Sequence, residues 1–134
     1  TVLPLAGLHL LLAEDNELNS EIATALLEEQ GASITAVENG RLALEAIQNA
    51  APRTYDAILM DVMMPEMNGL EATRCIRAFE GKGPGEGTPI IAMTANVFAD
   101  DVKACLDAGM NSHVGKPLDM KVLIGEILKY TNAR

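Results

Sequence analysis

Residues 57–61 read Ala-Ile-Leu-Met-Asp, a run of four apolar residues that ends on a carboxylate. A short apolar run of this kind is typical of a strand that is covered on both faces of a sheet. Three other runs, the last of them weaker, also stop at residues capable of phosphoryl chemistry: 8–13 before Glu14 and Asp15, 90–93 before Thr94, and 113–115 before Lys116.

Segments with helical periodicity separate these runs. Gly31 and Gly109 are expected to end two of the helices, and Asn68, three residues before Glu71, is expected to cap the start of another. The apolar positions that define the helices are Leu18, Ile22 and Leu26; Ala43, Leu44 and Ile47; Leu70, Thr73, Ile76 and Phe79; Phe98, Val102, Cys105 and Leu106; and Met120, Leu123, Ile124, Ile127 and Leu128.

The order of these elements predicts the fold class. With a further strand at 33–37 and the last at 112–115, strands and helices alternate five times along the chain. Alternating strands and helices favour parallel pairing with right-handed crossovers, which gives an α/β, doubly wound (βα)5 sheet. The reactive residues at the strand ends would then meet at one edge, where open α/β folds bind ligands.

Those strand-end residues have complementary chemistry. The Asp61 carboxylate is the candidate nucleophile, since a carboxylate can attack phosphorus and hold the group as an acyl phosphate. Glu14 and Asp15 beside it would create a cluster of repelling carboxylates that demands a cation, and oxygen ligands at an open site favour Mg²⁺. Lys116 would add a positive charge and Thr94 a hydroxyl donor. Each residue alone fits a helix cap, a turn or a solvated charge, but the combination does not.

Composition excludes other functions. The 134 residues are 49% hydrophobic, enough for one domain with an aliphatic core, and the net charge of −9 argues against nucleic-acid binding. No run approaches the ~20 apolar residues of a membrane span, so no membrane contact by this domain is expected. We expect Cys75 and Cys105 to be buried free thiols in a cytoplasmic protein, whose parent chain could still carry a membrane anchor.

The ends and one connection complete the organisation. Residues 1–7 are expected to be a linker remnant and 8–134 the domain itself. The glycine-rich stretch 81–87 follows a helix and precedes a strand, the reverse of a phosphate-binding loop, and is interpreted as a mobile surface connection.

Four motifs are spread over nearly the whole chain. They are Leu12-Ala13-Glu14-Asp15-Asn16; Leu59-Met60-Asp61-Val62-Met63-Met64-Pro65 with Met67-Asn68-Gly69; Ala92-Met93-Thr94-Ala95-Asn96; and residues 109–117, Gly-Met-Asn-Ser-His-Val-Gly-Lys-Pro. Together they resemble the receiver domain of bacterial two-component response regulators. The third helix and the residues near the fifth strand further resemble receivers fused to hybrid sensor histidine kinases.

The resemblance implies a function and a set of roles. It implies that Asp61 accepts a phosphoryl group from the phosphohistidine of a histidine kinase domain, with onward transfer to a histidine phosphotransfer protein. It also implies a flavodoxin-like sheet of order 2-1-3-4-5. The implied Mg²⁺ ligands are the side chains of Glu14, Asp15 and Asp61 with the backbone carbonyl of Met63; the implied phosphoryl contacts are Thr94 and Lys116; and the implied cis peptide is Lys116–Pro117.

One departure and two alternatives stay open at this point. The aromatic switch position of the family is His113 here, which could swing like Tyr or Phe, or simply pack half-buried beside its strand. A haloacid-dehalogenase-type phosphatase would also use an Asp nucleophile, but it needs an acid two residues later, where this chain has Met63. A pseudo-receiver that only binds partners is disfavoured by the complete set of acids, Thr94 and Lys116. As an isolated domain the chain is therefore expected to be a phosphoacceptor and not a turnover enzyme.

Overall fold

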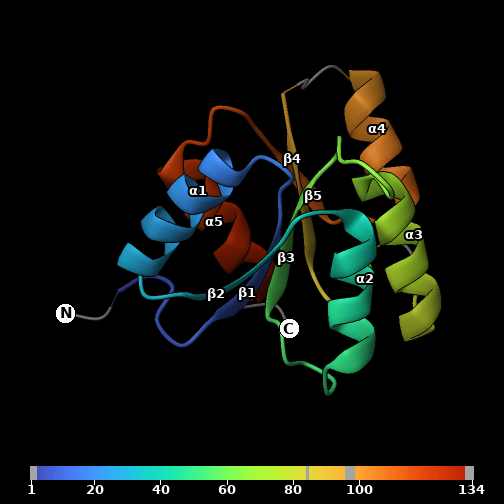
Figure 1. Ribbon diagram of the computed structural model, residues 1–134, viewed down its shortest axis with the longest axis horizontal. Coiled ribbons are helices and arrows are strands. Elements are labelled where there is room, and N and C mark those ends of the chain that lie inside the picture. Colours follow the sequence, from blue (N-terminus) through green and yellow to red (C-terminus); the bar gives the residue numbers. More distant parts are fainter. Residues whose placement is uncertain (1–2, 84, 96–98, 132–134) are drawn as a thin grey trace.

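A computed structural model describes residues 3–83, 85–95 and 99–131 of the protein (Figure 1). Phe98, expected on the fourth helix, and Asn96 lie outside the described residues. No helix within the described part of the chain is both long and apolar enough to cross a membrane. The elements are β1 (His9–Ala13), α1 (Glu17–Glu29), β2 (Ser33–Val37), α2 (Gly40–Asn49), β3 (Ala57–Asp61), α3 (Gly69–Glu80), β4 (Ile90–Thr94), α4 (Ala99–Ala108), β5 (Ser112–Gly115) and α5 (Met120–Thr131).

The strands form one parallel sheet in the order β2-β1-β3-β4-β5. Helices α1 and α5 cover one face, and α2, α3 and α4 cover the other (Figure 1). This is the flavodoxin-like (βα)5 arrangement, so the predicted fold class and strand order are confirmed. The order in which strands are added to the sheet reverses between β1 and β3. These two strands are neighbours, so the acids at their carboxyl ends lie side by side.

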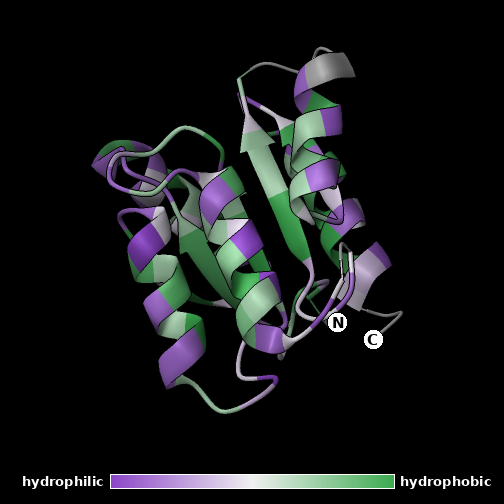
Figure 2. Cartoon of the chain, turned by 90° about the vertical axis from the view of Figure 1, so that its right-hand side faces the viewer, coloured by the Kyte–Doolittle hydropathy of each residue, from purple (hydrophilic) through white to green (hydrophobic). Residues whose placement is uncertain are grey.

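The core follows from the two-residue repeat of the strands. On β3, Ala57 and Leu59 face the α1/α5 layer, whereas Ile58 and Met60 face the α2/α3/α4 layer. All five residues of β3 and of β4 are buried, which explains why their sequences are continuous apolar runs. Figure 2 shows the resulting hydrophobic colouring along the strands at the centre of the molecule, between helices that carry both kinds of residue.

Helix α1 packs through a different face from the one that its periodicity suggested. Its buried residues are Ala23 and Leu27, while Leu18 is 63% exposed and Ile22 is 50% exposed. Successive residues are rotated by about 100° around a helix, so a shift of one position selects another face. Periodicity located an apolar stripe correctly, but that stripe does not pack on the sheet. Phe79, which lies on α3 as predicted, is 52% exposed near the end of that helix.

The segment before β1 packs against the domain. Leu5 is fully buried in the core beside α1, and its N–H donates to the Gln30 carbonyl at 2.9 Å. Gly31 has φ +102°, and a Cβ there would lie 2.9 Å from the Ala6 backbone. The close approach of these two segments places Leu5 inside the packed structure, although the sequence alone assigned residues 1–7 to a linker.

The two cysteines differ in burial, so the expectation that both are buried is wrong for Cys75. Cys105 is 2% exposed, whereas Cys75 is partly exposed on α3. Burial, with a smaller contribution from the charge of Asp101, raises the pKa of the Cys105 thiol. We therefore expect iodoacetamide to alkylate Cys75 at least about tenfold faster than Cys105 at pH 8, since Cys105 needs local opening first. Mass spectrometry of Cys75→Ser and Cys105→Ser measures each rate, and equal rates would contradict the burial difference.

Candidate functional site

The carboxyl ends of four strands build one site. Asp61 is the last residue of β3 and Thr94 the last of β4. Glu14 and Asp15 directly follow β1, and Lys116 directly follows β5. The parallel register aligns these ends, with Asp61 opposite Met93 and Thr94 opposite Gly115. The predicted strand-end residues therefore lie at the same edge of the sheet.

The acids form a cluster with the geometry of a cation site. One carboxylate oxygen each from Glu14, Asp15 and Asp61 lies within 4.8 Å of the others. Glu14 is 5% exposed and Asp61 6% exposed, while Asp15 lies at the surface. Oxygen-only donors at an edge open to solvent suit Mg²⁺, which retains several waters and bridges to phosphate oxygens. The residues present therefore fit Mg²⁺.

Lys116 neutralises part of this negative charge. Its Nζ donates to Glu14 Oε2 and to Asp61 Oδ2, both at 3.0 Å. Burial alone would lower the pKa of Lys116, but the hydrogen bonds and charges of Glu14 and Asp61 outweigh burial, so the pKa is raised. The ammonium is thus held in its charged form against two nearly buried carboxylates. The Lys116–Pro117 peptide bond is cis.

Backbone N–H groups donate to the second carboxylate oxygen of Glu14 and of Asp61. The Asn16 N–H donates to Glu14 Oε1 at 3.2 Å, and the Met63 N–H donates to Asp61 Oδ1 at 3.3 Å. Asn16 also caps α1, since its Oδ1 accepts from the Asn19 N–H at 2.9 Å. No local pattern in the sequence predicted the backbone contact of Asn16 to Glu14. The Met63 side chain is 77% exposed and turns away from the core.

Thr94 and His113 lie on β4 and β5, which are on the opposite side of β3 from β1. Thr94 is 7% exposed at the end of β4, and its carbonyl accepts from the Lys116 N–H at 2.9 Å. His113 is half-buried on β5, opposite Ala92 of β4. Its position fits either of the two interpretations left open from sequence.

Gly69, at the start of α3, is a site residue that sequence reasoning underrated. A Cβ at this position would lie 2.4 Å from the Asp61 carbonyl oxygen and 3.0 Å from Met60. From sequence, Asn68 was expected to cap the helix and Gly69 belonged to the motif around Asp61, but no role was given to its missing side chain. The missing side chain is what allows α3 to begin against the end of β3, so that the backbone beside Asp61 is held in place.

We expect Gly69→Ala to destabilise the protein by about 2–3 kcal/mol, because the methyl group has no room beside the Asp61 carbonyl. Urea unfolding measures the change. Gly125→Ala is the matched control, since nothing lies within 4 Å of a Cβ there and the residue is inside α5. That control should gain about 0.5–1 kcal/mol from helix propensity. Equal stabilities for the two variants would show that the close contact at Gly69 relaxes freely.

An apolar groove adjoins the site on the α1 side. It encloses about 530 Å³ and runs from Glu14 and Lys116 along the exposed side of α1. Its apolar wall includes Ile22, Leu26 and Pro117. A larger cavity of about 650 Å³ lies between the ends of α2 and α3 and contains none of the strand-end residues. The groove beside Lys116 is therefore the cavity relevant to the chemistry.

Comparison with known proteins agrees with this geometry. The family model described as "Response regulator receiver domain" matches residues 10–128. "Probable histidine kinase 1" of Oryza sativa subsp. indica is 41% identical over an aligned length of 140 positions. The match covers 84% of this chain and 14% of that relative. The chain thus matches a small part of a much longer kinase.

Two crystal structures extend the comparison. The receiver domain of a sensor histidine kinase from Pseudomonas aeruginosa PAO1, with a magnesium ion coordinated in its active-site cleft, is 38% identical with a TM-score of 0.82, covering 95% of this chain and 99% of that one. The receiver domain of a Saccharomyces cerevisiae response regulator, in complex with a histidine phosphotransfer protein, is 26% identical with a TM-score of 0.83, covering 96% and 91%.

Proposed function

This chain belongs to the response-regulator receiver family, and on that premise we propose that it accepts a phosphoryl group on Asp61 from a phosphohistidine and passes it to a histidine phosphotransfer protein. The contact of Lys116 with both Glu14 and Asp61 is the observation that carries the proposal most directly. This contact holds the positive charge of Lys116 against an oxygen of the candidate nucleophile, beside the other acids of the cluster. A surface cluster of acids alone would not bring a lysine from β5 to the end of β3.

The proposed reaction is an in-line transfer. One Asp61 oxygen forms a bond to phosphorus while the P–N bond of the phosphohistidine breaks. The electron pair stays on the imidazole, whose other ring nitrogen keeps its proton, so neutral histidine leaves. Lys116 moves with the negative charge from the carboxylate to a phosphoryl oxygen, and the Thr94 hydroxyl and Met63 N–H donate to the others. The loop after β3 and the Lys116 side chain position the group.

The metal has a defined place in this proposal. Glu14, Asp15 and Asp61, with the Met63 backbone carbonyl, would hold Mg²⁺, which neutralises charge on the transferring group when bound. A magnesium ion in the cleft of the P. aeruginosa relative supports this assignment.

We further propose that a helical histidine phosphotransfer protein docks on α1 beside the site. Leu18 and Ile22 are large apolar side chains left exposed on the helix that borders the groove at Lys116. Exposed apolar residues next to a reactive centre fit a partner that must bring its own histidine to Asp61. The S. cerevisiae complex shows that a receiver of this fold binds such a protein. Because the chain matches 14% of the length of an O. sativa histidine kinase, the parent protein is proposed to be a hybrid histidine kinase.

Labelling with phosphoramidate, a small donor whose P–N bond mimics phosphohistidine, tests the proposal. In Mg²⁺ we expect one phosphoryl group per chain, held in a hydroxylamine-sensitive acyl phosphate, and the label should require the metal. Multiple turnover of p-nitrophenyl phosphate should be absent, because Met63 supplies no acid beside Asp61. Sustained turnover would favour the haloacid-dehalogenase-type phosphatase. Complete absence of labelling by phosphoramidate and by phosphorylated phosphotransfer domains would favour a pseudo-receiver.

A further inference from the structure

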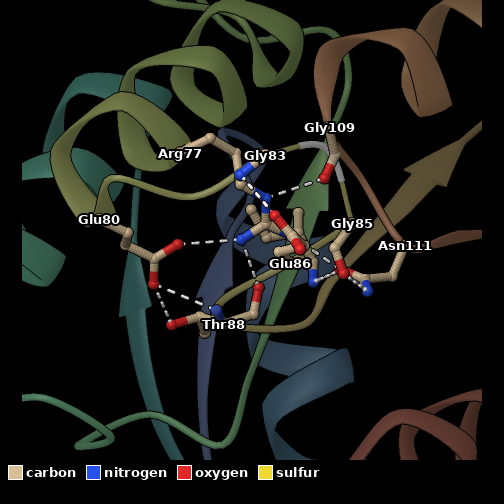
Figure 3. Close-up of polar contacts among 9 residues, drawn as sticks. Arg77, Glu80, Gly83, Gly85, Glu86, Thr88, Gly109 and Asn111 are labelled. Carbon is tan, nitrogen blue, oxygen red and sulfur yellow. Dashed lines mark hydrogen bonds and ion pairs between the residues drawn. The ribbon is translucent and has the colours of Figure 1, made fainter.

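Arg77 is a buried cation that lies far from the acid cluster. It is 4% exposed, near the end of α3, and its guanidinium makes four hydrogen bonds (Figure 3). Nε donates to the Gly109 carbonyl at 3.0 Å, and Nη2 donates to Asn111 Oδ1 at 2.9 Å. Nη1 donates to the Thr88 carbonyl at 2.8 Å and to Glu80 Oε1 at 3.0 Å. One side chain thereby joins α3, the segment that enters β4 and the turn between α4 and β5.

Asn111 continues this network to the first residue of β4. Its Oδ1 accepts from the Ile90 N–H at 2.9 Å, and its own N–H donates to the Ile90 carbonyl at 2.8 Å. Its Nδ2 donates to the Gly85 carbonyl at 2.9 Å, and the Gly85 N–H donates to the Gly109 carbonyl at 3.0 Å. The glycine-rich connection was expected from sequence to be a mobile surface segment. At Gly85 it is held by these two hydrogen bonds. Arg77 and Asn111 together hold the starting ends of β4 and β5 against each other.

These two strands deliver two of the proposed phosphoryl contacts. Thr94 ends β4 and Lys116 follows β5, with Thr94 opposite Gly115 in the register. β5 is a four-residue strand at the edge of the sheet and, within the described ranges, pairs with β4 alone. A short edge strand has few ladder hydrogen bonds to define its register, and a slip of one residue would turn every side chain to the opposite face. Fixing the start of β5 therefore fixes where Lys116 emerges.

The acids depend on other strands. Glu14 and Asp15 follow β1, and Asp61 ends β3. Among the described residues, none of the hydrogen bonds of Arg77 goes to β1 or β3. The network thus supports the Thr94 and Lys116 side of the site separately from the metal side.

We propose that Arg77, acting with Asn111, is a positioning residue for phosphoryl transfer, because it sets the places of Thr94 and Lys116 from the opposite ends of their strands. This inference rests on the proposed function, since it assigns a role relative to the Asp61 chemistry. Loss of the network should affect labelling of Asp61 more than binding of Mg²⁺. A purely structural role would weaken both in proportion to the loss of stability.

The test compares Asn111→Ser and Arg77→Lys with two controls. Asn111 is partly exposed, so Asn111→Ser should still fold while the side-chain bonds to Ile90, Arg77 and Gly85 are lost. Arg77→Lys keeps the charge without the fork of donors. Glu86→Gln changes an exposed neighbour whose Oε1 accepts from the Gly83 N–H, a contact that a Gln oxygen can keep. Leu27→Ala, in the core of the other layer, supplies a variant of comparable or lower stability.

We expect phosphoramidate labelling to slow by about tenfold in Asn111→Ser and Arg77→Lys, because small misplacements of contacting groups cost this much or more. The Mg²⁺ dissociation constant should not rise by more than about twofold, because Glu14, Asp15 and Asp61 keep their places on β1 and β3. Glu86→Gln should label at the normal rate, and Leu27→Ala should label normally wherever it is folded. Unchanged labelling in both network variants, or a parallel loss of Mg²⁺ affinity, would overturn the proposal.

Amide exchange tests the positioning without any phosphoryl chemistry. The Lys116 N–H bonds to the Thr94 carbonyl at 2.9 Å, and the Glu14 N–H bonds to the Val37 carbonyl at 3.1 Å. Asn111→Ser should accelerate exchange at Lys116 and leave Glu14 unchanged, whereas general destabilisation would accelerate both. If the unmodified protein fails to label, the proposed function fails, but unequal exchange would still support the positional role. Equal acceleration of exchange at the two amides in Asn111→Ser would overturn the positional role.

Discussion

Asp61→Asn is expected to abolish phosphoryl labelling while the protein remains folded. The amide has nearly the shape of the carboxylate but lacks its charge and nucleophilicity, so no acyl phosphate can form. The Asp61 side chain is 8% exposed and accepts from Lys116 and from the Met63 N–H. An amide oxygen can keep one of these acceptor contacts, and loss of one negative charge relieves repulsion from Glu14 and Asp15. The far-ultraviolet circular dichroism spectrum should therefore be unchanged.

Removal of this carboxylate should also weaken Mg²⁺ binding by at least about tenfold, because one of the clustered acids is lost. Asp107→Asn, on an exposed part of α4, is the matched control and should label like the unmodified protein. The measurement is intact-protein mass spectrometry after incubation with phosphoramidate and Mg²⁺. Labelling that persists in Asp61→Asn would place the acceptor at another residue and remove the basis of the proposed function.

Lys116→Met is expected to slow labelling by about 10²–10³-fold, the loss typical when one donor to a developing anion is removed. The variant also leaves Glu14 and Asp61 without their shared cation. We expect the metal-free variant to lose about 2 kcal/mol of stability at neutral pH, since two nearly buried carboxylates are then uncompensated. Mg²⁺ should bind more tightly than in the unmodified protein, because it no longer competes with the ammonium, and should restore the lost stability.

The pH dependence gives this prediction a second measurement. The pKa of Lys116 is raised above the ordinary 10.5 in the folded protein. Its stabilising contribution is therefore complete below pH 10.5 and disappears as the pH rises through the raised pKa. Urea unfolding of both proteins without metal should show a stability gap that closes at high pH. Lys82→Met, which removes an exposed lysine at the opposite edge, should show no such gap. A gap that persists at high pH would contradict the charge-based explanation.

The helices and strands followed closely from local signals. The continuous apolar run 57–60 predicted a doubly covered strand, and β3 is buried throughout. Asn68 was expected to cap the third helix, and its Oδ1 accepts from the Glu71 N–H at 3.0 Å. Such signals work because caps, breakers and periodicity act within a few residues, through backbone geometry that does not depend on the rest of the molecule.

How those helices and strands pack against one another was harder to predict from the sequence. The apolar repeat that marked α1 in the sequence includes Leu18 and Ile22, but these residues are exposed and Ala23 is buried. Which helix face packs is decided by the angle and distance at which the helix meets the sheet, and small residues allow the closest approach. Burial of Leu5 likewise depends on the neighbouring turn at Gly31, which no local pattern of residues 1–7 reports.

The sequence by itself determined which chemistry stands at the ends of the strands, because alternation of strand and helix makes the sheet parallel and so brings those ends to one edge. Only the tertiary structure decided how the set is held. The bonds of Lys116 to Asp61 and Glu14 join residues 55 and 102 positions apart, and those of Arg77 to Gly109 and Asn111 span 32 and 34. Contacts across such separations depend on the folded path of the backbone, and a lone lysine or arginine has no local signal for its distant partners.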